Sequence, residues 1–428
     1  MADRAQTPEP FRPAVFVRTL GCKVNRAESE EVAAALVGRG VRFVPEDEAS
    51  VVIVNTCTVT GEADRKARKA VRHALASPAE PVVVVMGCLA ALDAEGLELL
   101  GDRVVVEPER EHVAARVSAL LGVSAHPIVK PVRFGEGFRV RVGVKVEDGC
   151  DSFCAYCIVP FARGAPRSVS LGAVVDEVTG LVAAGTAEVV LTGINIGRYD
   201  SDGIGLPGLV KEIAATGIRR IRISSIEPLD LTGELLDTLA DTPQLCHHLH
   251  VPLQSGSDAV LSAMKRGYAA TAYLERIDAL RKVLPGVALT TDVMLGFPGE
   301  TERDVEETLA LIRQVVFARL HIFRYSKRKG TLAASMGSQV SPPESAHRAA
   351  RLRAEDSRLR AERAASRCGQ EAEVLVEEVV ASGEKTTATG TTGDYLRVRL
   401  DGAGLAPGDV VRVRLGREVS QVLLAERL

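Results

Sequence analysis

The stretch PVVVVMGC, residues 81–88, is an apolar run that ends abruptly at a glycine and a cysteine. A run this short and this apolar predicts a β-strand buried on both faces, as in a parallel sheet covered by helices. Cys88 is then either a small buried residue at the end of a core strand or a residue with a chemical role.

Two earlier apolar runs end in the same way: AVFVRTLGC ends at Cys22, and SVVIVNTC ends at Cys57. Helix-like segments separate the three runs, so the pattern over residues 14–125 predicts a parallel sheet with covered faces. The carboxyl ends of parallel strands meet at one edge, and Cys88 should therefore lie beside the other two cysteines.

Three cysteines at one edge have two interpretations. Cysteine is often simply buried, and this holds for each of the three alone. Their equivalent positions at three strand ends favour ligation of a metal or a cluster. The chain holds eight cysteines, and we expect a cytoplasmic, reducing environment in which they are not disulfides.

The composition is that of an ordinary globular protein, with 46% apolar and 25% charged residues among 428. The net charge of −3 argues against strong overall attraction to nucleic acid but allows local basic patches. No apolar run reaches the roughly 18 residues of a membrane span. Residues 1–13 are polar and predict a disordered tail without the apolar core of a signal peptide.

The rest of the chain predicts three further parts. Residues 126–340 contain six apolar runs separated by helix-like segments, which predicts an incomplete (βα)6 barrel with its chemistry at the carboxyl rim. Residues 341–366 are rich in Arg and Ala and predict a helical connector. Residues 367–428 contain five short strand-like segments with glycine turns, which predicts a small antiparallel barrel of the kind that binds oligonucleotides. The fold class is α/β.

The strongest chemical signal is EDGCDSFCAYCIVP, in which Cys150, Cys154 and Cys157 form a C-x3-C-x2-C motif. Thiolates suit iron–sulfur clusters, and three ligands to a four-iron cluster leave one iron open for another molecule. Zinc is the alternative, but a structural zinc site needs four closed ligands. The nearest histidines, His247, His248 and His250, lie about 90 residues further on, and His250 is expected to be a hydrogen-bonded interior residue rather than a ligand.

A C-x3-C-x2-C loop after the first strand of such a barrel resembles the radical S-adenosylmethionine enzymes. The motifs TLGCKVNRAESE, NTCTVT, GCDSFCAYCIVPFARGAPRS, LTGINIG, RISSIEP, HLHVPLQSGSDAVLSAMKRGY and DVMLGFPGETE extend the resemblance to the methylthiotransferases, over nearly the whole chain. The resemblance implies two [4Fe–4S] clusters, one on Cys22, Cys57 and Cys88 and one on the motif cysteines, together with a C-terminal TRAM domain that binds the substrate.

Within this family, Lys23 and Val24 in GCKVN resemble the branch that acts on tRNA carrying N6-threonylcarbamoyladenosine. The isopentenyladenosine branch typically reads GCQMN, and the branch that modifies a ribosomal protein reads GCPKN. The resemblance implies methylthiolation at C2 of adenosine 37. C2 is unactivated, so a 5′-deoxyadenosyl radical, formed from S-adenosylmethionine at the motif cluster, would remove its hydrogen.

The resemblance also implies contacts to S-adenosylmethionine at the strand ends of the middle domain; ordinary loop capping is the alternative for each of them. These residues are Tyr156, Gly193, Ser225, Glu227, Gln254, Ser255, Asp292 and Gly296. Cys246 and Cys368 match no motif and are expected to be structural.

Basic residues in three places suit contacts with RNA phosphates, and a solvated charged surface is the alternative for each. They are Arg65, Arg68, Lys69 and Arg72; Arg324, Lys327, Arg328 and Lys329; and Arg397 and Arg399, with Arg412 and Arg414 alternating likewise. From Ser366 onward, however, 8 Lys and Arg residues stand against 10 Asp and Glu residues.

This acidic balance keeps a protein substrate open as an alternative. A non-catalytic iron–sulfur protein that binds RNA is a further alternative, but it leaves the implied S-adenosylmethionine contacts unexplained. The expected partners are tRNA and an electron-donor protein, and the chain is expected to be a monomer.

Overall fold

The computed structural model describes residues 13–124, 126, 139–383 and 385–428. It divides into two compact units. The first comprises the described residues up to 126 together with Phe161–Arg163, and the second comprises the remainder. Apart from Pro13, the predicted N-terminal tail lies outside the described residues. No helix in the described ranges is long and apolar enough to cross a membrane.

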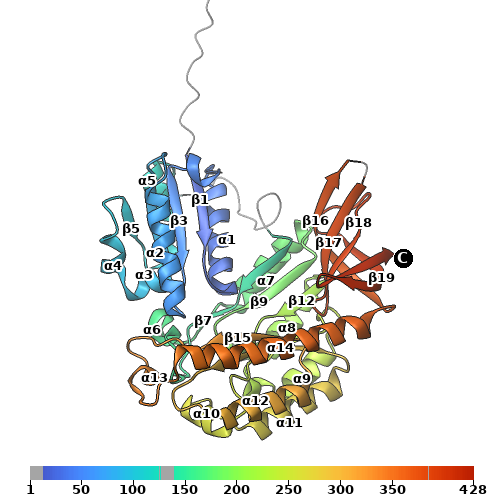
Figure 1. Cartoon of the computed structure of the whole chain (residues 1–428). Helices are drawn as coiled ribbons and strands as arrows, with labels where there is room; N and C mark the ends of the chain where they lie inside the picture. The colour runs from blue at the N-terminus through green and yellow to red at the C-terminus, as the bar shows by residue number, and fades with distance from the viewer. Residues whose placement is uncertain (1–12, 125, 127–138, 384) are drawn as a thin grey trace, which may run out of the picture. The chain divides into compact units, whose positions relative to one another are not determined.

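The first unit is built on a five-stranded sheet in the order β2-β1-β3-β4-β5, in which every pairing is parallel (Figure 1). The strands are β1 Ala14–Thr19, β2 Arg42–Phe43, β3 Val51–Thr56, β4 Val82–Gly87 and β5 Val104–Val106. The helices are α1 Lys23–Val37, α2 Gly61–Leu75, α3 Cys88–Leu92, α4 Ala94–Glu98 and α5 Val113–Leu121. The predicted parallel α/β fold is confirmed.

Both faces of this sheet are covered. On one face, Val83 and Val85 of β4 pack with the alanines of α2. On the other, Val84 and Met86 of the same strand pack with α1 and α5. Successive residues of a strand point to opposite faces, so a strand covered on both sides must be apolar throughout. This explains the unbroken run VVVVM.

The second unit contains six strands that pair in parallel. They form two three-stranded sheets, β6-β9-β12 and β13-β14-β15, and single bridges such as Ile221–Leu245 connect β12 to the chain at β13. The strands are β6 Arg141–Lys145, β9 Glu188–Thr192, β12 Arg220–Ile223, β13 His248–His250, β14 Ala288–Leu295 and β15 Arg319–Arg324. Short antiparallel pairs join β7 Glu147–Asp148 to β8 Arg167–Ser168 and β10 Asp200–Ser201 to β11 Ile204–Gly205.

Helices cover one face of these six strands, where alternate residues such as Val189, Leu289 and Val293 join a large apolar core. The helices are α6 Val159–Arg163 (divided between the units), α7 Leu171–Ala183, α8 Leu206–Ala215, α9 Gly233–Ala240, α10 Asp258–Ala263, α11 Ala270–Val283, α12 Glu302–Val315, α13 Leu332–Ser335 and α14 Pro342–Arg367. The intervening strand residues point the other way. We call that side, which carries Glu188, Arg222, His248, His250, Thr290, Asp292 and His321, the inner face.

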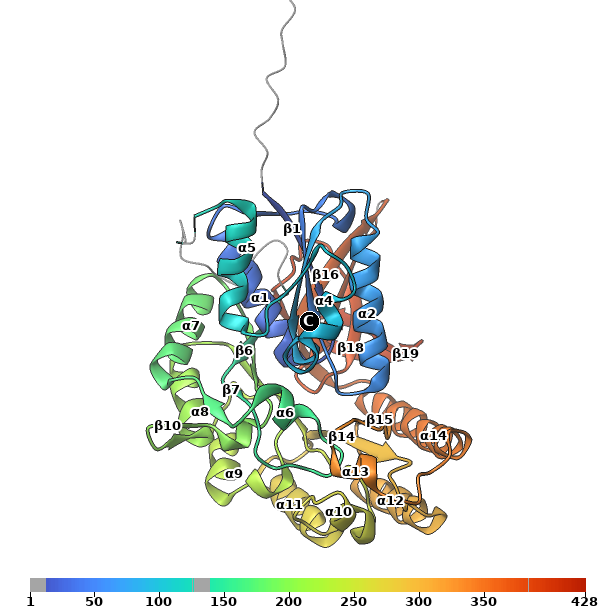
Figure 2. The same cartoon turned by 90° about the vertical axis from the view of Figure 1, so that its left-hand side faces the viewer.

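The predicted helical connector lies within α14, which runs beside β15 in Figure 2. After it, five strands form a closed barrel in the order β16-β17-β18-β20-β19. They are β16 Glu371–Ser382, β17 Lys385–Thr392, β18 Arg397–Asp401, β19 Val410–Val419 and β20 Val422–Arg427. The five predicted strands are confirmed, but the barrel is not wholly antiparallel as predicted, because β18 pairs with β20 in parallel.

The turn between β17 and β18 is attached to the inner face of the six strands. Arg222 is completely buried and donates to the carbonyl oxygens of Gly393 (2.9 Å) and Thr392 (3.3 Å). The Tyr395 ring lies 3.9 Å from the Arg222 guanidinium and makes an edge contact with His248. Glu188 neutralises Arg222 at 2.9 Å. The small barrel is thus held by a buried polar cluster and not by apolar contact alone.

Candidate active site

Three cysteines of the first unit stand at adjacent strand ends. Cys22 follows β1 and precedes α1, Cys57 follows β3, and Cys88 follows β4 as the first residue of α3. Strands β1, β3 and β4 are neighbours in the sheet. The order of the strands therefore brings the three thiols to one edge, as the sequence predicted.

The surroundings of these thiols disfavour the thiolate form unless a cation is present. The pKa of Cys57 is raised to about 11, mainly by burial and in smaller part by the neighbouring thiols Cys88 and Cys22. Burial likewise raises the pKa of Cys22, while the charge of Arg163 lowers it. Thiolates are the ligand form of cysteine, so this site suits an electron-poor metal centre better than free thiolates.

Two glycines allow the cysteine segments to approach closely. Gly87 has a φ of 92°, and a Cβ atom there would lie 2.3 Å from Oδ1 of Asn55. Gly21 has a φ of 104°, and its Cβ would lie 2.6 Å from the Cβ of Cys57. Any other residue at either position would be strained and would displace a neighbouring cysteine segment.

Two asparagines connect the cysteine segments through hydrogen bonds. Asn25 Nδ2 donates to Oδ1 of Asn55 (3.0 Å) and to the carbonyl oxygen of Thr56 (2.8 Å). Asn55 Nδ2 donates back to the carbonyl oxygen of Asn25 at 2.7 Å. The Cys22 thiol donates to Asn25 Oδ1 at 3.3 Å. Both asparagines are buried, so the network orients the segments that carry Cys22 and Cys57.

A buried cation lies within this network. Arg163 donates to Asn25 Oδ1 at 2.9 Å, and it pairs with Glu28 at 2.8 Å. Arg110 approaches the same carboxylate at 3.0 Å. The sequence analysis missed Asn25, Asn55, Glu28 and Arg163, although they lie in or next to quoted motifs, because nothing in the local pattern indicates partners that are 30 or 135 residues away.

In the second unit, Cys150, Cys154 and Cys157 lie on the loop that follows β7. Backbone hydrogen bonds fix the loop. Cys150 N donates to the carbonyl oxygen of Gly164 (3.0 Å), and Ala155 N donates to that of Met264 (2.9 Å). A Cβ on Gly149 would lie 2.1 Å from the carbonyl oxygen of Ala165, so this loop also requires a glycine.

The three motif thiols interact with one another electrostatically. The pKa of Cys157 is raised to about 12, mainly by burial and in smaller part by the charges of Cys154 and Cys150. Burial raises the pKa of Cys154 as well, and the guanidinium of Arg266 opposes it. As in the first unit, the site disfavours three bare thiolates and favours thiolates bound to a metal centre.

Arg266 anchors a polar cluster beside this loop. It donates to the sulfur of Cys154 at 3.5 Å, forms an ion pair with Glu227, and lies against the ring of Tyr268. Tyr268 in turn donates to the carbonyl oxygen of Pro252 at 3.0 Å. Burial raises the pKa of Tyr156 well above its ordinary value, so its hydroxyl stays protonated. Arg266 and Tyr268 belong to the quoted stretch KRGY, but the sequence analysis assigned them no role.

The cysteine triads can be compared with the compact ligand group that a single zinc ion requires. Zinc with Zn–S bonds of about 2.3 Å holds its tetrahedral sulfurs about 3.8 Å apart. Among the described residues, one group of three His, Cys, Asp or Glu side chains has all its ligand atoms within 4.8 Å, and it contains no cysteine. Neither cysteine triad forms such a compact group.

The predicted S-adenosylmethionine contacts lie at several strand ends of the second unit. A Cβ on Gly193 would lie 2.8 Å from Oε2 of the buried Glu147. Gln254 has a φ of 65° and is bridged to Val293 of β14. Ser255 makes hydrogen bonds toward Ser257 and Thr308, and Gly296 has its φ at 75° against Ser345 of α14.

Three of the predicted contacts already have partners. Glu227 pairs with Arg266, and Ser225 is bridged to His250 at the end of β13. Asp292 Oδ1 lies 3.2 Å from His250 Nε2 and 3.3 Å from His321 Nδ1. The Asp292 carboxylate is therefore engaged by two imidazoles.

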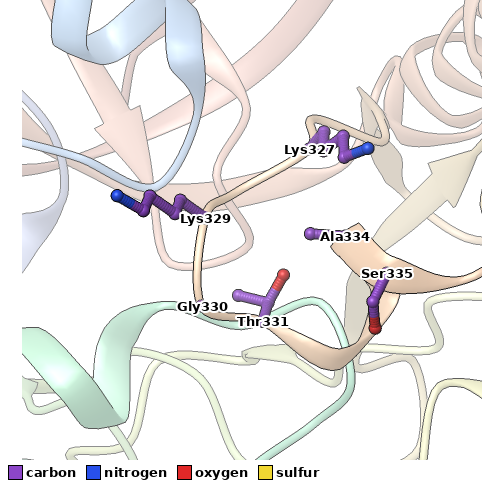
Figure 3. Close-up of a pocket in the computed structure, with 6 residues that line it drawn as sticks. All are labelled: Lys327, Lys329, Gly330, Thr331, Ala334 and Ser335. Carbon is purple, nitrogen blue, oxygen red and sulfur yellow. The ribbon is translucent and has the colours of Figure 1, made fainter.

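The basic cluster after β15 borders an open pocket. Figure 3 shows Lys327 and Lys329 extended away from each other, while Ser335 comes from α13 and Thr331 from the loop just before it. The hydroxyls of Thr331 and Ser335 donate to the carbonyl oxygens of Arg328 and Leu332, each at 2.8 Å. At this pocket the two lysines are thus the side chains that offer charge to an anion.

The four basic residues predicted on α2 differ in whether they are available to bind RNA. Arg65, Lys69 and Arg72 are exposed. Arg68 pairs with Asp93 and donates to the carbonyl oxygen of Gly96 at 2.7 Å, so it joins α2 to the segment around α4. A phosphate would have to compete with these partners for Arg68.

The two arginine pairs of the C-terminal barrel differ in whether carboxylates neutralise them. On β19, Arg412 and Arg414 pair with Glu371 at 2.7 and 3.3 Å. On β18, Arg397 and Arg399 are exposed on one face and stand opposite Thr391 and Thr389. Within the described part of the chain no carboxylate pairs with either of them. Arg397 and Arg399 therefore offer the less neutralised basic surface.

Comparison with known proteins identifies the families to which parts of the chain are similar. Residues 144–312 match the radical SAM superfamily, and residues 14–106 match the uncharacterized protein family UPF0004. In a solved structure, the radical S-adenosylmethionine methyltransferase TsrM from Kitasatospora setae, the similarity covers 76% of this chain and 74% of that chain, with a TM-score of 0.54 and 16% identity. At 16% identity this similarity shows that the two chains share a fold.

Two relatives show to which family within the radical SAM superfamily the chain belongs. The chain is 36% identical to threonylcarbamoyladenosine tRNA methylthiotransferase MtaB of Bacillus subtilis, over 94% of this chain and 93% of that protein. It is also 36% identical to tRNA-2-methylthio-N(6)-dimethylallyladenosine synthase of Acidothermus cellulolyticus, over 99% and 90%. The chain belongs to the radical S-adenosylmethionine methylthiotransferases, which are transferases that use S-adenosylmethionine and two [4Fe–4S] clusters.

Proposed function

We propose that this chain transfers a methylthio group to C2 of N6-threonylcarbamoyladenosine 37 in tRNA. The observation that carries the proposal is the pair of cysteine triads, one at the carboxyl ends of the adjacent parallel strands β1, β3 and β4 and one on the loop that follows β7. The similarity to the Bacillus subtilis enzyme over 94% of the chain supports the choice of nucleoside.

Each triad would hold one [4Fe–4S] cluster. Cys150, Cys154 and Cys157 would hold the cluster that binds S-adenosylmethionine, and Cys22, Cys57 and Cys88 the auxiliary one. When bound, the two clusters supply the electron that cleaves S-adenosylmethionine and a site for the sulfur that is transferred. The chain itself disperses charge: Arg266 lies beside Cys154, and Arg163 lies within the Asn25 network beside Cys22.

S-Adenosylmethionine would contact the residues at the strand ends of the second unit. We assign this role to Tyr156, Gly193, Ser225, Glu227, Gln254, Ser255 and Gly296. The absence of a side chain at Gly193 leaves the buried carboxylate of Glu147 close to the backbone, where Glu147 already accepts from Asn195 N at 2.7 Å. Asp292, also predicted as such a contact, has its carboxylate engaged by His250 and His321 and would contact S-adenosylmethionine only through the remaining oxygen.

The C-terminal barrel would act as a TRAM domain and contact tRNA through Arg397 and Arg399. The exposed residues of α2 and the lysines beside α13 would add phosphate contacts. An electron-donor protein, a monomeric state and a cytoplasmic location complete the proposal.

The test is reconstitution of both clusters under anaerobic conditions, followed by reaction with S-adenosylmethionine, a reductant and tRNA that lacks the methylthio group. The tRNA is digested and its nucleosides are analysed by mass spectrometry. We expect a methylthio group on threonylcarbamoyladenosine. Release of 5′-deoxyadenosine without any change in a nucleoside would keep the radical reaction and exclude tRNA as the substrate.

The second candidate substrate is N6-dimethylallyladenosine in tRNA. It is favoured by the equal identity to the Acidothermus cellulolyticus synthase. The same reaction with two tRNAs, one carrying each adenosine, separates the candidates: the proposal requires product from the threonylcarbamoyl substrate and at least tenfold less from the other.

A further inference from the structure

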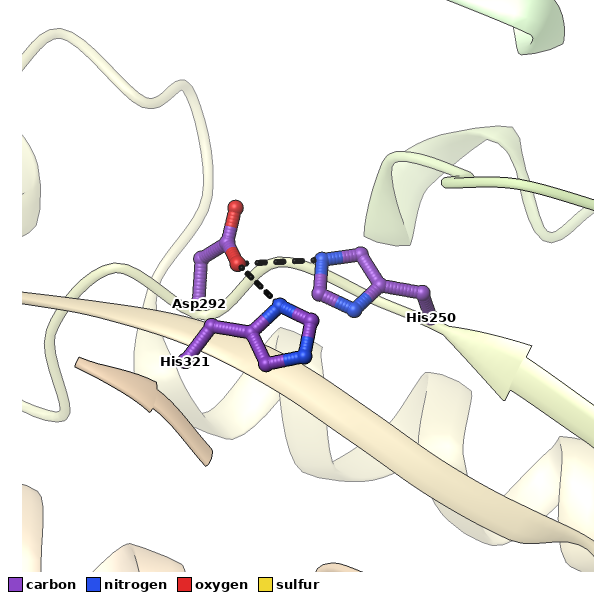
Figure 4. Close-up of side chains that lie close together, drawn as sticks. All are labelled: His250, Asp292 and His321. Carbon is purple, nitrogen blue, oxygen red and sulfur yellow. Dashed lines mark ion pairs between the residues drawn. The ribbon is translucent and has the colours of Figure 1, made fainter. Parts of the chain in front are cut away.

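Three side chains on the inner face form a compact cluster. His250 comes from β13, Asp292 from β14 and His321 from β15, and their ligand atoms all lie within 4.8 Å of one another. Figure 4 shows both imidazoles directed at the carboxylate of Asp292. These are three consecutive strands of one parallel sheet.

The register of the sheet explains why they meet. Asp292 pairs with His321 directly across β14 and β15, and His250 pairs with Thr290, two residues before Asp292. Residues two apart on a strand share a face, so the three side chains must point to the same side. The cluster is thus built into the rigid part of the sheet and does not depend on a loop.

We propose that His250, Asp292 and His321 form a binding site for a divalent metal ion of the size of Zn²⁺. Two histidine nitrogens and one carboxylate oxygen are a usual ligand set for such ions, and three protein ligands leave a position open. This site shares no residue with either cysteine triad and contains no sulfur ligand.

The distances fit the proposed ion. Metal–ligand bonds of about 2.0–2.1 Å separate tetrahedral ligand atoms by about 3.3–3.4 Å. The distances from Asp292 Oδ1 to His250 Nε2 and to His321 Nδ1 are 3.2 and 3.3 Å. The two rings lie 5.1 Å apart at an angle of 26°, so they approach the carboxylate side by side.

An outer set of hydrogen bonds orients the first histidine. His250 Nδ1 lies 2.9 Å from the hydroxyl of Thr290, and His248 Nε2 lies 3.0 Å from the same oxygen. If His250 Nδ1 donates to Thr290 and Thr290 donates to His248, then His250 Nε2 carries the lone pair that a metal requires. Such outer partners are typical of metal-bound histidines.

The site has room for a further ligand. The side-chain exposure rises from 10% for His250 to 27% for Asp292 and 42% for His321. The ion would therefore be held from the sheet side and reached from the open side, where water or an oxygen atom of another molecule completes its coordination.

The test is zinc retention by the holoenzyme with both clusters in place, so that the six cluster cysteines are occupied. The protein is stripped of loose metal, incubated with two equivalents of ZnCl2 and desalted, and zinc and iron are measured by mass spectrometry. Zinc K-edge absorption then reports the ligand atoms. We expect one zinc per chain, with nitrogen and oxygen neighbours and no sulfur.

The variants are His321→Asn and Asp292→Asn, which should lower zinc affinity at least 100-fold while the iron content stays unchanged. Thr290→Val should lower it about 10–100-fold. His247→Asn is the matched control, because His247 is exposed, adjacent in the chain and outside the cluster. Failure of the wild type to retain zinc, sulfur in the zinc shell, or equal retention by His321→Asn would each overturn the proposal and leave a hydrogen-bonded triad.

Discussion

At the scale of single residues, the auxiliary cysteine site depends on positions that have no side chain. Gly87 adopts a φ of 92° one residue before Cys88, and its Cα faces Asn55 and the backbone of Thr56. Asn55 belongs to the network that also fixes Asn25. A side chain at position 87 therefore acts on two cysteine segments at once, its own and the one that ends at Cys57.

We expect Gly87→Ala to lose the auxiliary cluster, because the added methyl would lie 2.3 Å from Asn55 Oδ1 and 2.5 Å from the Thr56 carbonyl oxygen. Iron content after reconstitution should fall from about eight to about four atoms per chain. Gly180→Ala in α7 is the control, since nothing lies within 4 Å of its Cβ, and it should keep the full iron content. Full loading of Gly87→Ala would contradict this account of the site.

At the scale of elements, two strands of the C-terminal barrel carry the same short sequence but differ in the charges of the residues opposite them. RVR in β18 and RVR in β19 both place two arginines on one side of a strand. Glu371 and Glu373 on β16 stand opposite the β19 pair, whereas threonines of β17 stand opposite the β18 pair. The partner strand, not the arginine motif, decides which pair remains available to RNA.

Replacing Arg397 and Arg399 by Ser should weaken tRNA binding and reduce the slope of log K against log salt concentration by about 1.5, because two phosphate contacts are lost. The same change at Arg412 and Arg414 should alter the slope by less than half as much. tRNA binding is measured by filter retention between 50 and 200 mM salt, where log K is expected to fall linearly with log salt concentration. Equal slopes for the two variants would show that β18 is not the contact surface.

Helix α12 illustrates how a charge stabilises an element end. Asp304 accepts from Thr301 N at 2.7 Å and from the hydroxyl of Ser257 at 2.5 Å. Burial alone would raise the pKa of Asp304, but the hydrogen bonds from Ser257 and Thr301 outweigh it and hold the pKa below its ordinary value. The stabilisation is therefore present above the unfolded pKa near 3.9 and is lost as pH falls through the lower folded pKa.

Asp304→Asn should cost about 1 kcal/mol at pH 7, as expected for the loss of a helix cap. The difference from the wild type should shrink as the pH falls below about 4. Urea unfolding midpoints at pH 7 and pH 3.5 measure both effects. A difference that stays constant with pH would mean that the charge of Asp304 contributes nothing.

At the scale of the whole molecule, buried polar contacts determine how the small barrel is attached within the second unit. Arg222 and Glu188 are both fully buried, and Arg222 also bonds two carbonyl oxygens of the β17–β18 turn. Removing one partner of a buried ion pair leaves an uncompensated buried charge. The free-energy cost of that charge exceeds the net stabilisation that the intact pair provides.

Arg222→Met should destabilise the attachment by about 3 kcal/mol or more and increase hydrogen exchange in the β17–β18 turn. Arg219→Met is the matched control. Arg219 also reaches the small barrel, through Glu373 at 2.8 Å, but both side chains are about half exposed, so its loss should cost less than about 1 kcal/mol. Similar exchange in the two variants would mean that burial does not matter at this contact.

The sequence alone predicted the structure correctly where an element is marked by a local or periodic pattern of residues. Unbroken apolar runs predicted the covered strands of the first unit, and alternation with helices placed Cys22, Cys57 and Cys88 at one edge. Arg266, Asn55 and Tyr395 escaped notice because their partners are distant in sequence, so no local spacing marks them. The parallel pairing of β18 with β20 was missed for the same reason, since five short strands can close a barrel in several orders.

The most direct test of the central claim is the iron content and product pattern of the triple variant Cys22→Ala, Cys57→Ala, Cys88→Ala after anaerobic reconstitution. Two separate cluster sites predict about four irons per chain instead of about eight, continued reductive cleavage of S-adenosylmethionine to 5′-deoxyadenosine, and no methylthio nucleoside. A triple variant that still forms the methylthio nucleoside would contradict the claim that the strand-end cysteines hold the second cluster of the reaction.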